Sequence, residues 1–168
     1  LRIFVSCTAM MVIGSSPLTA QNSSADFGWQ VVPAASSVSF QSAYNQNIIE
    51  TNKFGITSGT ISPAGLATVR INLDSVDTSV KLRDARLRFL LFETVQHPEA
   101  VITTRIDSSS LLDLAMSRRM TLTLPYTLDL HGVARSAFAD IAVTMMTNDM
   151  ISVSSVGPIV LQTSDFGM

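Results

Sequence analysis

The stretch 120–131 alternates apolar and polar side chains over the longest such run in the chain, and this alternation constrains the fold most. Successive side chains of a β-strand point to opposite faces, so one face of this strand is dry and the other is wet. A dry face on a single sheet has to be buried inside a barrel or a sandwich. We expect its apolar residues, which are Leu122, Leu124, Tyr126, Leu128 and Leu130, to line an interior.

Other parts of the chain show the same alternation in shorter runs. Residues 66–74 place Val69 and Ile71 on one face and polar side chains on the other, and short strand-like segments occur near 29–32, 37–41, 100–107, 137–146 and 150–161. Turn residues separate these runs. The pattern predicts an all-β protein of about eight short antiparallel strands, arranged as a barrel or a sandwich.

One stretch departs from the alternation. Between residues 74 and 99 the apolar positions Leu82, Ala85, Phe89 and Phe92 recur at the three-to-four spacing of a helix. Asp77 or Thr78 is suited to cap its start, and the sequence His97-Pro98 disfavours its continuation. We therefore expect one inserted helix over about residues 80–95, with Phe89 and Phe92 facing the interior.

The N-terminus has the features of a secretory signal peptide. Arg2 precedes an apolar run over residues 3–13, and small and polar residues follow up to Ala20. We predict a signal over residues 1–20, removed after Ala20, and an exported, soluble domain over residues 21–168. A membrane anchor and a lipid attached at Cys7 are the alternatives, but the run is about half the roughly 20 residues that cross a bilayer, and it continues past Cys7.

Composition excludes several functions. The chain has 168 residues, only 14% of them charged, and a net charge of −2, which suits one domain without a basic patch for nucleic acid. It also lacks a Gly-rich phosphate loop, a Gly-x-Ser-x-Gly elbow and a His-Glu-x-x-His sequence. We predict no catalytic residue.

The polar candidates each allow a structural interpretation. Asp77, Arg83 and Asp84 could form a charged rim that meets a ligand head group, or they could pair with one another on a solvated helix face. His97 and His131 are far apart in sequence, and neither has a carboxylate at ligand spacing. We therefore predict no metal site, and we expect His131 and Asp165 to bond to the backbone of their loops.

Several short segments resemble the YceI-like family in order and spacing. They are Ser75–Thr78, Arg83-Asp84 with Leu87, Phe92, Pro98, Leu130–Gly132 and Asp165–Met168. The resemblance covers about residues 27–168. It implies an extended, lipocalin-like antiparallel β-barrel whose lumen binds a polyisoprenoid chain, export to the bacterial periplasm, and no enzyme activity or cofactor other than the bound lipid.

Two departures from the family limit this implication. Residues 86–92 match the family only at Phe92, so the local wall of the lumen is expected to differ. Family members also continue past the Asp-Phe-Gly sequence into a final strand. A barrel without that strand would expose two edges, which favour pairing with another chain, for example in a homodimer.

The resulting functional prediction is a binding protein that carries or stores a long isoprenoid lipid, such as a quinone, a quinone precursor or a polyprenyl compound. The alternatives are an enzyme acting on a lipid-like substrate inside the same barrel and a quinone-linked partner of a membrane redox protein. Transient contact with a membrane would serve both the lipid-binding protein and the partner of a membrane redox protein. The expected ligand contacts are Val69, Ile71, Phe89, Phe92, Leu122, Leu124, Tyr126, Leu128 and Leu130.

Overall fold

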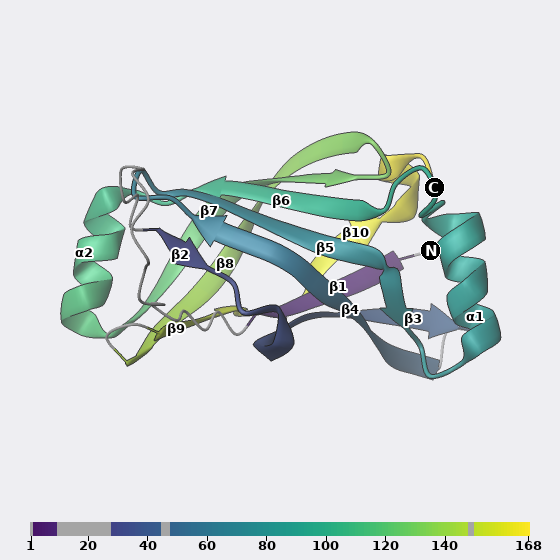
Figure 1. Ribbon diagram of the computed structural model, residues 1–168, viewed down its shortest axis with the longest axis horizontal. Coiled ribbons are helices and arrows are strands. Elements are labelled where there is room, and N and C mark those ends of the chain that lie inside the picture. Colours follow the sequence, from purple (N-terminus) through teal and green to yellow (C-terminus); the bar gives the residue numbers. More distant parts are fainter. Residues whose placement is uncertain (1, 10–27, 45–47, 148–149) are drawn as a thin grey trace, which may run out of the picture.

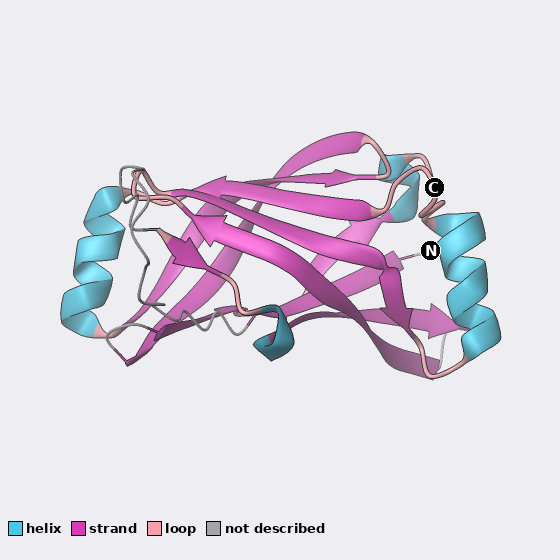
Figure 2. Cartoon of the chain, in the orientation of Figure 1, coloured by secondary structure: helices cyan, strands magenta, loops and turns pink. Residues whose placement is uncertain are grey.

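A curled antiparallel sheet forms most of the protein in the computed structural model, which describes residues 2–9, 28–44, 48–147 and 150–168 (Figures 1 and 2). Helices stand at its two ends. The strands are β1 (Arg2–Ala9), β2 (Trp29–Gln30), β3 (Ser36–Tyr44), β4 (Ile48–Ile61), β5 (Leu66–Asp77), β6 (Glu99–Arg105), β7 (Arg119–Leu130), β8 (Val133–Thr147), β9 (Met150–Ser155) and β10 (Ile159–Gln162). The helices are α1 (Lys81–Arg86), the π-helical turn η2 (Leu87–Leu91), α2 (Ser108–Ser117) and the 3-10 turns η1 (Pro33–Ala35) and η3 (Thr163–Phe166).

The order of the strands closes the sheet. Strands β3 to β9 pair with their neighbours in sequence order, every pair being antiparallel. Strand β1 pairs with β3 on one side and with β10 and β9 on the other. The chain therefore has the all-β, lipocalin-like barrel architecture that the sequence predicted.

Strand β1 corrects one expectation. The exposed edges predicted for a barrel without its last strand are bridged, since Ile3 to Ala9 lie opposite Ser42 to Ser36 of β3 and Arg2 to Val5 lie opposite Gln162 to Ile159 of β10. Residues predicted to belong to a signal peptide thus occupy the gap. The predicted cleavage site after Ala20 lies outside the described residues, and the signal peptide stays a prediction.

The apolar faces point inward as the alternation predicted. In β7, Leu128 and Leu130 are each 6% exposed, whereas Thr121 and Thr123 are exposed. In β5, Ile71 is likewise buried. An aromatic cluster joins the strands to the helical segment: Phe40 stacks on Phe54 with ring centroids 4.7 Å apart, and Phe54 meets Phe92 edge-on at 5.4 Å.

The helix between β5 and β6 is shorter than predicted. It ends at Leu91 rather than near Val95, because the last turn widens: the Phe92 amide donates to the Leu87 carbonyl, five residues back, and Glu93 then adopts a left-handed conformation with φ 47°. This widened turn leaves Phe92 in the core at 3% exposure. The helix thus ends six residues before His97, at a turn where Phe92 packs against Phe54.

The start and the apolar face of this helix also differ from the prediction. Neither Asp77 nor Thr78 caps it, since the N-cap residue is Val80 and no side chain bonds to the first free amides. Leu82 is 64% exposed and Phe89 63% exposed, so the expected interior position of Phe89 is wrong. The sequence spacing is helical, but Phe92 and not Phe89 faces the core.

A second helix, α2, occupies residues expected to begin a loop. Its serine-rich start resembles loop sequence, and serine also favours helix N-termini. Leu114 enters the core at 3% exposure, while Met116 is 87% exposed. Figure 1 places α2 at one end of the barrel and α1 at the other. None of the described helices is long and apolar enough to span a membrane.

Candidate functional site

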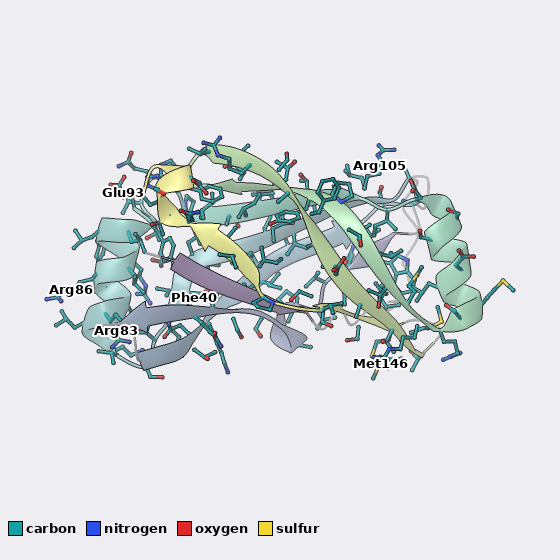
Figure 3. All side chains as sticks on the ribbon, turned by 180° about the vertical axis from the view of Figure 1, so that it is seen from behind. Phe40, Arg83, Arg86, Glu93, Arg105 and Met146 are labelled. Atoms are coloured by element: carbon teal, nitrogen blue, oxygen red, sulfur yellow. The ribbon has the colours of Figure 1, made fainter. Side chains whose placement is uncertain are left out.

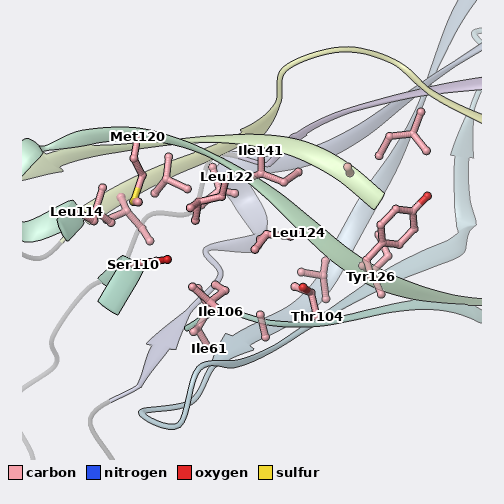
Figure 4. A pocket seen from close by; sticks show the side chains of 18 residues that line it. Ile61, Thr104, Ile106, Ser110, Leu114, Met120, Leu122, Leu124, Tyr126 and Ile141 are labelled. Carbon is pink, nitrogen blue, oxygen red and sulfur yellow. The ribbon is translucent and has the colours of Figure 1, made fainter. Parts of the chain in front are cut away.

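Two cavities lie inside the barrel. The larger, of about 150 Å³, is at the α2 end and is enclosed by side chains from β4 to β10 and from α2 (Figure 4). The smaller, of about 80 Å³, extends toward η2 and Phe92. Ile102, Tyr126 and Ile159 belong to the walls of both. The cavities are therefore neighbours along one lumen that runs between the helical ends.

The lumen walls suit an apolar molecule. Among the described residues the walls hold no charged side chain, and their polar groups are Thr104, Ser110 and Tyr126. The Thr104 hydroxyl donates to the Pro125 carbonyl at 2.7 Å, so it is already bonded. Burial raises the pKa of the Tyr126 phenol, which keeps this group neutral at physiological pH. A bound molecule would meet aliphatic surface almost throughout.

Most of the predicted lining residues lie in these walls. Leu122, Leu124, Tyr126 and Val69 line the larger cavity. Tyr126, Leu128, Leu130, Ile71 and Phe92 line the smaller one. Phe89 lines neither and is the exception, because it points outward from η2.

Sequence reasoning missed part of the wall. Ser110 and Leu114 of α2 close the larger cavity, and Ala139 and Ile141 of β8 and Val153 of β9 face it. The α2 residues gave no signal, because their segment was expected to be a loop. The β8 residues gave only a weak signal, since Asp140 and Thr144 flank the apolar positions but Phe138 and Ala142 interrupt the alternation.

Asp84 is a structural group rather than part of a rim. It is 1% exposed and accepts hydrogen bonds from the Thr78 amide at 2.8 Å and the Thr78 hydroxyl at 2.7 Å, with the Lys81 ammonium 3.9 Å away. The Thr78 hydroxyl contributes most to holding the pKa of the Asp84 carboxyl below its ordinary value, against the opposing effect of burial. Asp84 therefore fixes the turn that enters α1.

The other rim candidates lie at or near the surface. Asp77 is exposed and accepts from the Ser79 amide at 2.9 Å, Arg83 is partly buried on α1, and Asp165 is exposed in η3. The basic side chain described beside Asp84 is Lys81, and Arg88 lies 3.8 Å from Asp74.

The histidines contradict the sequence expectation. His97 and His131 are far apart in sequence, and neither was expected to have a carboxylate at ligand spacing. Their ring centroids lie 4.4 Å apart, and the Glu93 carboxylate lies 3.6 Å from His131 Nε2. Glu93 and His97 lie four residues apart in the connection between η2 and β6, a spacing that sequence reasoning overlooked, whereas their meeting with His131 of the β7–β8 turn depends on the fold.

Comparison with known proteins assigns the family. A family model of the YceI-like domain matches residues 29–168. A polyisoprenoid binding domain from Saccharophagus degradans is 27% identical, with a TM-score of 0.72 over 97% of this chain and 80% of that one. A YCEI protein from Campylobacter jejuni is 17% identical, with a TM-score of only 0.46 over 92% of this chain and 78% of that one. No curated protein matches. The family model spans most of this chain, and the chain has the same kind of fold as the polyisoprenoid binding domain. The chain therefore belongs to the YceI-like domain family.

Proposed function

We propose that this protein binds a long-chain isoprenoid lipid in its lumen and carries or stores it, the ligand being a quinone, a quinone precursor or a polyprenyl compound. The observation that carries the proposal is the apolar lumen, whose described walls hold no charged side chain. The similar structure from Saccharophagus degradans is a polyisoprenoid binding domain, which supports the same class of ligand.

The physical chemistry of such a lumen favours recognition of the tail. Burial of one CH₂ group contributes about 0.8 kcal/mol, so one five-carbon isoprene unit contributes about 4 kcal/mol before the costs of ordering and association. The described walls provide few polar groups for a head group. We expect affinity to follow tail length and to depend only weakly on head-group chemistry.

An enzyme acting inside the barrel is a weaker alternative. General acid–base chemistry needs a group that exchanges protons near neutral pH. In the lumen walls that the structure describes, Tyr126 is the one titratable side chain, and its raised pKa moves it further from that range. Binding without turnover fits this lining better.

A carrier of a water-insoluble lipid has to collect it from a membrane, and α1 with η2 offers a surface for that contact. Leu82, Phe89 and Leu90 are between 63% and 77% exposed there, and Lys81 and Arg86 lie on the same segment. Apolar side chains beside basic ones suit an anionic lipid surface. We propose transient membrane contact through this surface, which would also serve a quinone-linked partner of a membrane redox protein.

Export to the periplasm is part of the same proposal. Removal of residues 1–20 would take β1 away and leave unpaired the edges of β3, β9 and β10 that β1 covers. Unpaired strand edges favour association with another chain, so we propose that the processed protein forms a homodimer through them. The mass of the mature N-terminus and light scattering of the processed protein test this.

The proposed ligand is tested by extracting lipid from protein purified without detergent and identifying it by mass spectrometry. We expect an isoprenoid that co-purifies in a fixed ratio to the protein. Recovery of only ordinary phospholipid fatty chains, in amounts unrelated to the protein, would contradict the proposal.

A further inference from the structure

Three side chains from two segments of the chain converge at the α1 end of the barrel. Glu93 follows η2, His97 precedes β6, and His131 lies in the turn between β7 and β8. One ligand atom from each lies within 4.8 Å of the others. Figure 3 shows Glu93 at this end, the one that also holds Arg83 and Arg86 of α1.

The backbone holds this cluster in unusual conformations. Glu93 and His131 both have positive φ, 47° and 54°, which side chains other than glycine rarely adopt. Gly132 at φ 72° completes the two-residue turn after His131. A Cβ on Gly132 would lie 3.2 Å from His97 Cε1, so glycine at this position lets the imidazole ring of His97 approach the turn.

One nitrogen in the cluster lacks a hydrogen bond. His131 Nε2 is buried, and no described group donates to it or accepts from it. The nearest carboxylate oxygen, Glu93 Oε2, is 3.6 Å away, which is too long for a hydrogen bond. A buried polar atom without a partner destabilises the fold, and a metal ion bound to that atom would remove this cost.

We propose that Glu93, His97 and His131 bind a divalent transition-metal ion of the Zn²⁺ class. Imidazole and carboxylate are ligands that this class prefers, at about 2.1 Å. Two such ligand atoms at a tetrahedral angle lie about 3.4 Å apart, close to the 3.6 Å between Glu93 Oε2 and His131 Nε2. The His97 ligand atom lies within 4.8 Å of the other two, so it would have to move closer when the ion binds.

The position of the site assigns it a role in the barrel. Phe92 and Leu130, the chain neighbours of Glu93 and His131, both line the smaller cavity. An ion bound here would tie the segment after η2 to the β7–β8 turn and hold that end of the lumen closed. With three protein ligands, a four-coordinate ion keeps one position for water or for an oxygen atom of a bound molecule.

The test measures Zn²⁺ binding to the untagged full chain, by competition with a chromophoric chelator, and the melting temperature with and without Zn²⁺. We expect one Zn²⁺ per chain and a higher melting temperature with the ion, because an ion that binds only the folded state stabilises it. Glu93→Gln, at a side chain that is 45% exposed, should fold normally, bind Zn²⁺ at least about tenfold more weakly and lose most of the thermal shift.

Glu99→Gln is the matched control. Glu99 lies six positions further along the chain and pairs with Arg70 at 3.1 Å, outside the cluster. It should bind Zn²⁺ as the wild type does. Co²⁺ should give visible absorption bands with the wild type and lose them in His131→Ala. Absence of stoichiometric Zn²⁺ binding, or equal losses in Glu93→Gln and Glu99→Gln, would overturn the proposal. Lipid binding plays no part in these measurements, so they stand apart from the proposed function.

Discussion

Filling the larger cavity from the β8 wall tests the lumen without introducing a polar group. Ala139 lies in that wall, directly across from Leu124 in the β7–β8 pair. Ala139→Leu adds three carbon atoms to the cavity. If three carbon atoms of the ligand can no longer be buried there, the binding free energy falls by about 2.4 kcal/mol, which corresponds to about 60-fold weaker binding.

The same substitution should not destabilise the empty protein. Burying three more carbons contributes up to about 2.4 kcal/mol, and strain from overpacking reduces this gain. For a domain of this size, 1 kcal/mol shifts the melting temperature by about 2–4 °C. We therefore expect a melting temperature between unchanged and about 10 °C higher, together with weaker ligand binding.

Ala134→Leu is the matched control, because Ala134 is exposed on the same strand, opposite Asp129. The assay is displacement of a fluorescent isoprenoid analogue, combined with thermal unfolding without ligand. Ala134→Leu should change neither result by much. Unchanged affinity in Ala139→Leu with a raised melting temperature would show that the ligand binds elsewhere, and the lumen would have to be abandoned as the site.

Three further predictions follow from the same structure. Leu124→Gln should lower both the amount of bound ligand and the melting temperature, because Leu124 lines the larger cavity. Thr123→Gln should reduce the stability by at most about 1 kcal/mol, since it loses only an exposed hydrogen bond to Asp140. Similar effects of the two substitutions would refute the prediction that only one face of β7 is turned to the lumen. Because the pKa of Asp84 is lowered in the folded state, its carboxylate stabilises the fold above its ordinary value of 3.8, and this stability is lost as pH falls through the lowered pKa. Asp84→Asn should thus be less stable at neutral pH and show a shallower acid decline in pH-dependent urea unfolding; parallel curves would contradict this. Leu90→Ser, at a 77% exposed position, should weaken sedimentation with anionic vesicles without altering the melting temperature, and unchanged sedimentation would remove α1 and η2 as the membrane contact.

The parts of the fold that depend on local patterns could be predicted from the sequence. Alternation in β7 and β5 is a property of each strand alone, so the inward faces of Leu124 and Ile71 followed from it. The end of the helix could not be predicted in this way, because Phe92 there packs against Phe54 of a strand distant in sequence.

The meeting of His131 with His97 and the pairing of β1 in the sheet could not be predicted either, because both are contacts between segments that are distant in sequence. Glu93, His97 and His131 come together only through the α1–β6 connection and the β7–β8 turn. The apolar segment of residues 2–9 has a composition that suits a signal peptide and a buried strand equally well. Which other strands lie beside such a segment is decided by the tertiary fold.

The central claim, that an apolar lumen selects a long isoprenoid by its tail, is tested most directly by a competition titration. Two pairs of ligands are compared on the same protein: one pair shares a head group and differs by several isoprene units, and the other shares a tail and differs in the head group. We predict that shortening the tail weakens binding far more than changing the head group does, because each unit removed forfeits up to about 4 kcal/mol of burial. Equal affinities for long and short tails would contradict the claim.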